Sequence, residues 1–360
     1  MIEDTAMGIL RMPRIHDGVY PHLLLSLFAK ISGNFRRVAP SDLLTIEKLT
    51  EWIIEQLVKK SIKADHTIIK TIITANFDQF NKKSWAYSLF LKIKKPKILF
   101  IEDASYGNRS FIVLPAKSLS IPVIELQHGF VNEEHIAYNL GKGLLLSKSI
   151  KKYFPDVFFA YGEFWKNSIR VPNQVISIGN PYLIEQVKAI NTVKYLNRKN
   201  KSILFLSSGI TVEETVDFIK LLKPMAASNG YKVVMRVHPF EKNEIEIRYG
   251  LLISLGVKIS EEPSLYDDFV KSDIIIGEVS TSLFESLAVP DKKQFLLMSS
   301  YTNSYFNNNI KIPKLYKETI SEIFSDNNYE KISSNYFWEQ NWEINFDNAL
   351  KNYKKDDLYN

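Results

Sequence analysis

The chain has 360 residues, of which 45% are hydrophobic and 24% are charged, enough apolar material for two globular domains of ordinary size. It contains no cysteine, which excludes disulfides, thiolate metal sites and cysteine nucleophiles. No apolar run reaches the roughly 18 residues of a membrane span, and the first residues lack the apolar centre of a signal peptide. We therefore expect a cytoplasmic protein.

The formal net charge is +6 and is spread over many lysines. Such an excess fits either an ordinary solvated surface or attraction to anionic lipid or a polyanionic substrate. The sequence has no zinc-finger spacing, no aromatic RNA-binding signature and no compact basic helix. Nucleic acid is therefore not an expected partner.

Residues 40–95 have mainly the apolar spacing of three and four that predicts helix, with Ser41 and Asp42 as the expected N-cap. The sequence does not indicate what residues 1–95 do. From residue 96 the pattern changes to short apolar strands that end in polar residues or glycine, at 97–103, 121–129, 156–162 and 174–181. Apolar strands without alternation, separated by helical stretches, predict a parallel sheet covered on both faces.

Residues 186–201 are polar and basic without a clean period, and we predict a linker there. A second alternation of strands and helices follows to about residue 323, including a helix expected to be capped by Thr211. The predicted organisation is an N-terminal domain at 1–185, a linker at 186–201, a C-terminal domain at 202–323 and a tail at 324–360. The tail contains one stretch that can form a last helix and pack back on the first domain.

Ligands of parallel α/β sheets bind beyond the carboxyl ends of the strands, so polar residues that end strands are the candidates for chemistry. Arg236 and His238, followed by Pro239, end one strand of the second half. Alternation places Arg236 and His238 on one side, where they can hold a base, a ribose or a phosphate. The alternative is structural, with His238 as the cap of the next helix and Arg236 paired with a surface acid.

Three hydroxyl residues stand between a predicted strand and the next helix: Ser280, Thr281 and Ser282. Hydroxyls and free N–H groups at a helix start can bind phosphate, although ordinary N-capping explains them equally well. Glu285, one turn later, can accept hydrogen bonds from ribose hydroxyls or be a solvated helix residue. A weaker phosphate candidate, which is otherwise a simple turn, consists of Ser207, Ser208 and Gly209.

Two strand ends of the first half also carry candidate residues. Glu102 and Asp103 end the first strand, where a carboxylate can act as a general base or can cap the next helix. The second strand ends in Gln127, His128 and Gly129. A histidine followed by glycine lets an imidazole and a backbone approach a ligand closely. The alternative is a turn glycine beside a structural histidine.

Two α/β halves, a strand that ends in His238 and Pro239, and a later hydroxyl group before a helix together resemble the GT-B glycosyltransferases. The pattern more narrowly resembles bacterial sialyltransferases and the capsule enzymes that transfer nonulosonic acids or Kdo-type sugars from CMP donors. The resemblance covers about residues 96–300. It implies two Rossmann-like domains facing across a cleft, with the acceptor on the N-terminal domain and the donor on the C-terminal domain.

In these families the His-Pro pair contacts the cytidine nucleotide, the hydroxyl residues hold the phosphate and an upstream acidic motif supplies the base. That acidic motif usually continues into glycine, whereas Ala104 follows here, so the choice between Glu102 and Asp103 stays open. The spacing from Arg236 to Glu285 is also similar to CDP-glycerol glycerophosphotransferases. The Gln-His-Gly stretch resembles a motif of capsule and Kdo-type transferases.

The resemblance implies an inverting transferase that needs no metal and no cofactor. Glu102 or Asp103 would deprotonate an acceptor hydroxyl, with His128 orienting the substrate or assisting as acid or base. The expected partners are a nucleotide-sugar donor, a glycan or lipid-linked acceptor and an anionic membrane at its inner face. The alternatives are CDP-glycerol transfer, a UDP- or GDP-sugar transferase, a sugar-nucleotide epimerase and a non-catalytic assembly partner.

Overall fold

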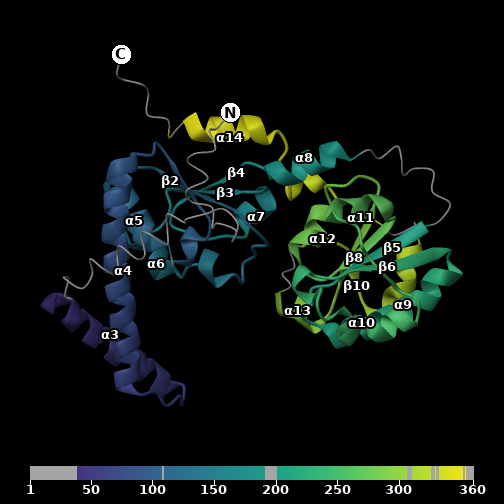
Figure 1. Cartoon of the computed structure of the whole chain (residues 1–360), viewed down its shortest axis with the longest axis horizontal. Helices are drawn as coiled ribbons and strands as arrows, with labels where there is room; N and C mark the ends of the chain where they lie inside the picture. The colour runs from purple at the N-terminus through teal and green to yellow at the C-terminus, as the bar shows by residue number, and fades with distance from the viewer. Residues whose placement is uncertain are drawn as a thin grey trace.

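The chain is described from a computed structural model. It covers residues 39–107, 109–190, 201–305, 310–325, 329, 332–351 and 353. Two separate parallel sheets form the centres of two α/β domains (Figure 1). The predicted α/β class with two Rossmann-like domains is confirmed.

The first domain begins with two long helices, α3 (Pro40–Lys59) and α4 (His66–Lys94). The predicted cap of α3 is wrong, because the cap position is Ala39, which has no side-chain acceptor. Proline fits the first helical turn, since it needs no hydrogen-bond donor there. α4 has a side-chain cap, with Asp65 accepting from the Ile68 amide at 2.9 Å. None of the helices in the described ranges is both long and apolar enough to cross a bilayer.

The first sheet has four parallel strands in the order β1-β2-β3-β4. Their bounds are β1 (Leu99–Ile101), β2 (Val123–Leu126), β3 (Val157–Ala160) and β4 (Gln174–Ser177). The connecting helices are α5 (Ser110–Ser118), α6 (Lys142–Leu146), α7 (Glu163–Asn167) and α8 (Pro181–Ala189), with 3-10 turns η1 (Ala104–Tyr106), η2 (Ile136–Tyr138) and η3 (Ile150–Tyr153). All four residues of β3 are buried, as expected of a strand covered on both faces.

The second sheet has six parallel strands in the order β10-β9-β8-β5-β6-β7. Their bounds are β5 (Lys201–Leu206), β6 (Tyr231–Arg236), β7 (Lys258–Ile259), β8 (Ile274–Gly277), β9 (Lys293–Leu297) and β10 (Lys314–Leu315). This is the doubly wound order of the dinucleotide-binding folds, which reverses between β5 and β8. Ligands of such sheets bind at the carboxyl ends of the two strands that flank the reversal.

The helices of the second domain lie on both faces of its sheet (Figure 1). They are α9 (Val212–Ser228), α10 (Ile245–Ser254), α11 (Leu265–Lys271), α12 (Thr281–Ser286) and α13 (Ser300–Tyr305), with 3-10 turns η5 (Pro239–Glu241) and η6 (Lys317–Phe324).

The predicted linker at 186–201 overlaps regular structure at both ends. α8 extends to Ala189 and β5 begins at Lys201, while residues 191–200 lie outside the described residues. Pro181 begins α8, where Asn180 is the cap and accepts from the Leu183 amide at 3.1 Å. The domain boundaries stay a prediction.

The C-terminal segment contacts both domains through buried aromatic residues. The Trp338 indole donates to the Phe284 carbonyl of the second domain at 2.8 Å. The Trp165 indole of the first domain donates to the Phe337 carbonyl at 2.6 Å. All four of these side chains, Trp338, Phe284, Trp165 and Phe337, are at most 1% exposed, and they belong to one apolar cluster. A buried indole N–H needs such a partner, so this cluster fixes the C-terminal segment between the domains.

The chain then forms η7 (Ser334–Tyr336) ahead of a last helix, α14 (Trp342–Lys351). Ala349 and Leu350 of this helix are buried in one cluster with Ile124 and Phe159 of the first sheet. The tail therefore contributes to the core of the first domain.

Gly162→Ala is expected to lower the free energy of unfolding by about 1–3 kcal/mol, the usual cost of overpacking. A Cβ at this position would lie 2.5 Å from the Phe337 carbonyl oxygen, so backbone must move. Urea unfolding measures the change. The matched control is Gly143→Ala in α6, where nothing lies within 4 Å of the new Cβ. Equal stability of the two variants would contradict the tight packing of this segment.

Candidate functional site

Asp103 and His128 meet at the carboxyl ends of the adjacent strands β1 and β2. Their register pairs Ile101 with Glu125, so the residues two and three positions later lie side by side. The His128 Nε2 is 3.1 Å from the Asp103 Oδ1. Asp103 has a φ of +59°, a left-handed conformation that is uncommon outside glycine and is concentrated at functional sites. A partly exposed imidazole this close to a carboxylate is an arrangement suited to general acid–base chemistry.

A buried carboxylate, Glu125, lies beneath this pair. It accepts hydrogen bonds from the Ser105 amide at 3.1 Å and from the Tyr138 hydroxyl at 3.0 Å, and a further one from the Ser105 hydroxyl. Its burial raises the pKa of Glu125 to about 7. These hydrogen bonds hold the turn that directly follows Asp103, and so fix the position of the Asp103 carboxylate.

Two further titratable groups border the pair. The Tyr106 hydroxyl is 2.9 Å from the His135 Nε2, and the Tyr106 ring centroid is 6.2 Å from that of His128. Burial lowers the pKa of His135, which favours the neutral imidazole.

The sequence analysis did not identify four members of this cluster: Tyr106, Glu125, His135 and Tyr138. One signal was available, since Glu125 is a charged residue inside an apolar strand.

The buried Glu125 predicts a pH-dependent stability. Its folded-state pKa of about 7 lies above the ordinary 4.5, so within that window the folded state keeps a proton that the unfolded chain releases. The free energy of unfolding therefore falls as the pH rises through the window, by roughly 3 kcal/mol. Glu125→Gln does not titrate and lacks this fall. Urea unfolding of both proteins across the window measures the difference, and parallel pH profiles would contradict it.

Gln127 has a positioning role in the structure. Its side-chain oxygen accepts from the Tyr161 amide at 2.9 Å, and its side-chain nitrogen donates to the Gly129 carbonyl at 2.8 Å. It thereby ties the ends of β2 and β3 together. Glu102 is exposed. Burial raises the pKa of Tyr161, and the negative charges of Glu285 and Glu102 raise it further. The predicted acceptor roles of Gln127 and Gly129 stay predictions.

The two domains meet where the candidate residues of each were predicted. A Cβ built on Gly129 would lie 3.9 Å from the Thr281 Oγ1. The neighbouring rings of Phe130 and Phe284 have centroids 5.4 Å apart. The end of β2, with the Asp103–His128 pair beside it, therefore lies next to the start of α12 in the other domain.

The hydroxyl group at the start of α12 includes a helix cap. Ser280 is the N-cap and accepts from the Leu283 amide at 3.3 Å, and its hydroxyl is 3.4 Å from that of Ser282. The capping alternative is thus present, and a phosphate role stays a prediction. Glu285 is not a solvated residue, because its carboxylate accepts from the Tyr266 hydroxyl at 2.9 Å and burial raises its pKa.

A second buried carboxylate, Glu278, lies in the loop after β8 at the reversal of strand order. Its carboxylate accepts from the hydroxyls of Ser208, Thr211 and Ser299. Thr211 is at the predicted N-cap position of α9, but its side chain makes no cap hydrogen bond and its hydroxyl donates to Glu278 instead. Glu278 was not among the predicted site residues.

Ser207 has a similar environment, since its hydroxyl donates to buried Glu241 at 2.8 Å. Gly209, with a φ of +72°, turns the chain after these serines. Both serine hydroxyls therefore already have carboxylate acceptors, and the predicted phosphate contact of this loop stays a prediction.

His238 caps η5, as the structural alternative expected, whereas the acid beside Arg236 is buried and not the expected surface acid. An Arg236 guanidinium nitrogen lies 2.8 Å from buried Asp268. His238 is exposed; its ring accepts from the Phe240 amide at 3.4 Å, and the two ring centroids are 4.5 Å apart. Pro239 follows as the first residue of η5. The exposed His238–Phe240 pair is thus the part of this strand end that a nucleotide can reach.

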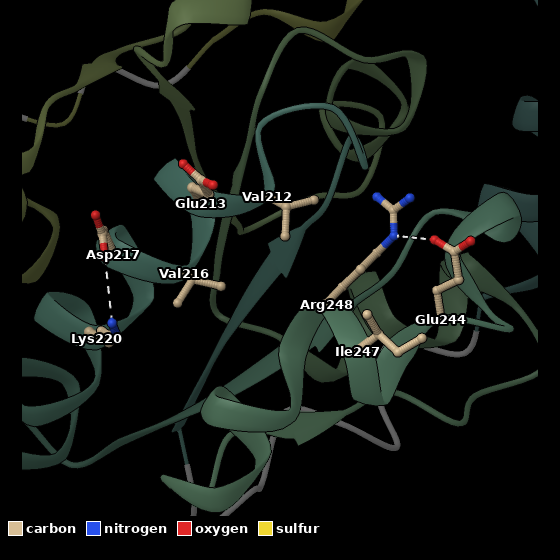
Figure 2. A pocket seen from close by; sticks show the side chains of 8 residues that line it. All are labelled: Val212, Glu213, Val216, Asp217, Lys220, Glu244, Ile247 and Arg248. Atoms are coloured by element: carbon tan, nitrogen blue, oxygen red, sulfur yellow. Dashed lines mark hydrogen bonds and ion pairs between the residues drawn. The ribbon is translucent and has the colours of Figure 1, made fainter.

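An open hollow of about 680 Å³ lies between α9 and α10 (Figure 2). It is lined by Val212, Glu213, Val216, Asp217, Lys220, Glu244, Ile247 and Arg248, none of which was predicted as a site residue. Two ion pairs lie among its side chains, Arg248–Glu244 at 2.7 Å and Lys220–Asp217 at 3.6 Å. Arg248 also donates to the Gly209 carbonyl at 3.0 Å. The hollow therefore borders the turn after β5.

No group of three or more His, Asp or Glu side chains that could hold a metal ion occurs in the part of the chain that the structure describes. The predicted independence from metals and cofactors stays a prediction.

No protein-family model and no curated protein matches the chain. Among solved structures, the UDP-GlcNAc 2-epimerase of Methanocaldococcus jannaschii in complex with UDP-GlcNAc and UDP matches at 16% identity and a TM-score of 0.46, over 76% of this chain and 81% of its own. The UDP-GlcNAc 2-epimerase of Neisseria meningitidis bound to UDP-GlcNAc matches at 17% identity and a TM-score of 0.47, over 81% and 90%. The wall teichoic acid polymerase TagF matches at 14% identity and a TM-score of 0.40, over 63% of each chain. At these TM-scores the likenesses carry no argument about activity, and the assignment of fold rests on the two parallel sheets.

Proposed function

We propose that this chain is an inverting glycosyltransferase that transfers an acidic sugar, a nonulosonic acid or Kdo, from a CMP-activated donor to a glycan hydroxyl. One observation carries the proposal, namely that a Cβ built on Gly129 would lie 3.9 Å from the Thr281 Oγ1. It brings the Asp103–His128 pair of one domain next to the hydroxyl group of the other. Inverting group transfer requires an acid–base pair on one side of the anomeric carbon and a phosphate-binding position on the opposite side.

The Asp103–His128 pair supplies the base in this mechanism. The imidazole takes the proton of the acceptor hydroxyl, and the carboxylate at 3.1 Å orients the ring and stabilises the imidazolium that forms. The acceptor oxygen then attacks the anomeric carbon from the side opposite the leaving group. The bond between that carbon and the phosphate oxygen breaks, and CMP leaves with the negative charge.

The donor nucleotide occupies the strand reversal between β5 and β8. The hydroxyls of Ser280, Thr281 and Ser282, with the free N–H groups around them, balance the charge of the departing phosphate. His238 and Pro239 contact the nucleotide on one side, and Glu285 accepts from its ribose. The acceptor is a glycan or a lipid-linked glycan at the inner face of a membrane.

A donor assay tests the proposal. The protein is incubated with CMP-activated nonulosonic acid, CMP-Kdo, CDP-glycerol, and UDP- and GDP-sugars, each with and without a glycan acceptor, and nucleotide release and product mass are followed. The proposal predicts CMP release that requires the acceptor and that is lost in Asp103→Asn. Consumption of CDP-glycerol would instead support polyol phosphate transfer, and consumption of a UDP-sugar without an acceptor would support an epimerase.

A further inference from the structure

The helical hairpin of α3 and α4 carries exposed apolar side chains at its far end. The hairpin extends away from the first sheet at the lower left of Figure 1. Its tip, residues 58–72, comprises the last turns of α3, the connecting loop and the first turns of α4. Four of its apolar side chains are exposed, Val58 by 65%, Ile62 by 48%, Ile68 by 60% and Ile72 by 53%. Ile68 and Ile72 are one helical turn apart and share a face.

Lysines surround these apolar side chains. The tip contains four lysines and one aspartate, a net charge of +3. Lys59, Lys60 and Lys63 are exposed, and no carboxylate of the described residues forms an ion pair with them. Lys70 does have one, since it bonds Glu47 on α3. Three available ammonium groups thus lie within a few residues of four exposed aliphatic side chains.

We infer that the hairpin tip is a docking surface for an anionic bilayer. Aliphatic side chains at the end of a protruding element can enter the boundary between headgroups and acyl chains, while neighbouring lysines contact anionic lipid and extend their stems along the apolar layer. Each lysine near such a surface contributes about 1 kcal/mol. The hairpin tip carries both the exposed aliphatic side chains and the lysines, and it is far from the candidate site.

The positive charge of the tip favours an anionic bilayer over a second copy of the chain as its partner. In a symmetric dimer the same patch meets itself, so the lysines of one tip would face those of the other. Like charges placed opposite one another oppose association. An anionic bilayer complements the same lysines, and the surface therefore fits lipid better than a second tip.

This docking rests on the proposed function for its purpose, because it would hold the enzyme where lipid-linked acceptors lie. The binding itself is measured without donor or acceptor, so its failure is distinguishable from failure of the proposed activity. The full chain is floated with vesicles of phosphatidylcholine alone and of phosphatidylcholine with phosphatidylglycerol. Preferential binding to the anionic vesicles, weakened by added salt, is the expected result.

Two variant sets test the surface independently. Replacing Lys59, Lys60 and Lys63 together by alanine is expected to weaken binding to anionic vesicles about a hundredfold. Ile62→Ser combined with Ile68→Ser is expected to weaken it at least about tenfold through lost apolar burial. All five side chains are exposed, so the variants should fold, and thermal unfolding checks this.

The matched controls lie in the second domain. Lys232, Lys242 and Lys258 are exposed lysines there, and their joint replacement by alanine should leave vesicle binding unchanged, as should His128→Ala. Equal binding of wild type to neutral and anionic vesicles would overturn the inference. So would full binding by the tip variants, or a shift from dimer to monomer in those variants without any vesicle binding by wild type.

Discussion

Replacement of His128 by alanine is expected to lower kcat about a thousandfold and to leave KM for the donor within a few-fold. Removing a positioned general base typically costs between about 10² and 10⁴ in rate. The imidazole lies at the end of β2 beside the other domain, whereas the proposed nucleotide contacts all belong to the second domain. A loss in kcat without a loss of donor binding is therefore the expected signature. Steady-state kinetics of CMP release measures both constants.

The carboxylate of the pair supplies the control for this result. Asp103→Asn should also lower kcat, and the double variant should lose little more than His128→Ala alone, because residues that act as a unit are not additive. Asp347→Asn, at an exposed position on α14, should have wild-type kinetics. Full activity of His128→Ala, or a loss confined to KM, would remove His128 from the mechanism.

The second large effect concerns the stability of the donor domain. Glu278→Ala is expected to lower the free energy of unfolding by about 3–5 kcal/mol. Its buried carboxylate accepts from three hydroxyls, and hydrogen bonds to a charged group contribute roughly 1.5–3 kcal/mol each without full additivity. The three donors come from the segments that follow β5 and β9. The variant therefore loosens the loops on both sides of the strand reversal.

Urea unfolding tests this stability prediction. Glu213→Ala, an exposed carboxylate in the first turn of α9, should change the free energy of unfolding by less than about 0.5 kcal/mol. Glu278→Gln keeps one acceptor oxygen and should lie between the two alanine variants. A Glu278→Ala protein as stable as Glu213→Ala would show that this buried network does not support the fold.

Strands such as β3 and β8 could be predicted because all their residues are buried and therefore form continuous apolar runs. Their order could not, since pairing of β5 with both β6 and β8 joins segments far apart in the sequence. The caps were predicted less well. Pro40 begins α3 ahead of the expected Ser41–Asp42 cap, because proline fits the first helical turn without a hydrogen-bond donor.

The rule that strand ends carry the site located Asp103 and His128 in the sequence. Their contact follows from the register of β1 and β2, which no single strand reveals. The same rule gave no indication that Glu278 would lie in a buried hydroxyl cluster, because its donors come from two separate segments, those that follow β5 and β9. Arg236 had two interpretations in the sequence, and only the packing of α11 shows Asp268 beside it.

Calorimetry of CMP, CDP, UDP and GDP with wild type and His238→Ala measures whether a cytidine nucleotide binds at the strand reversal of the second domain. We expect that CMP binds, that UDP and GDP do not, and that His238→Ala weakens CMP binding at least about tenfold, or roughly 1.4 kcal/mol. Binding of UDP or GDP in preference to CMP, or of no nucleotide at all, would contradict this expectation.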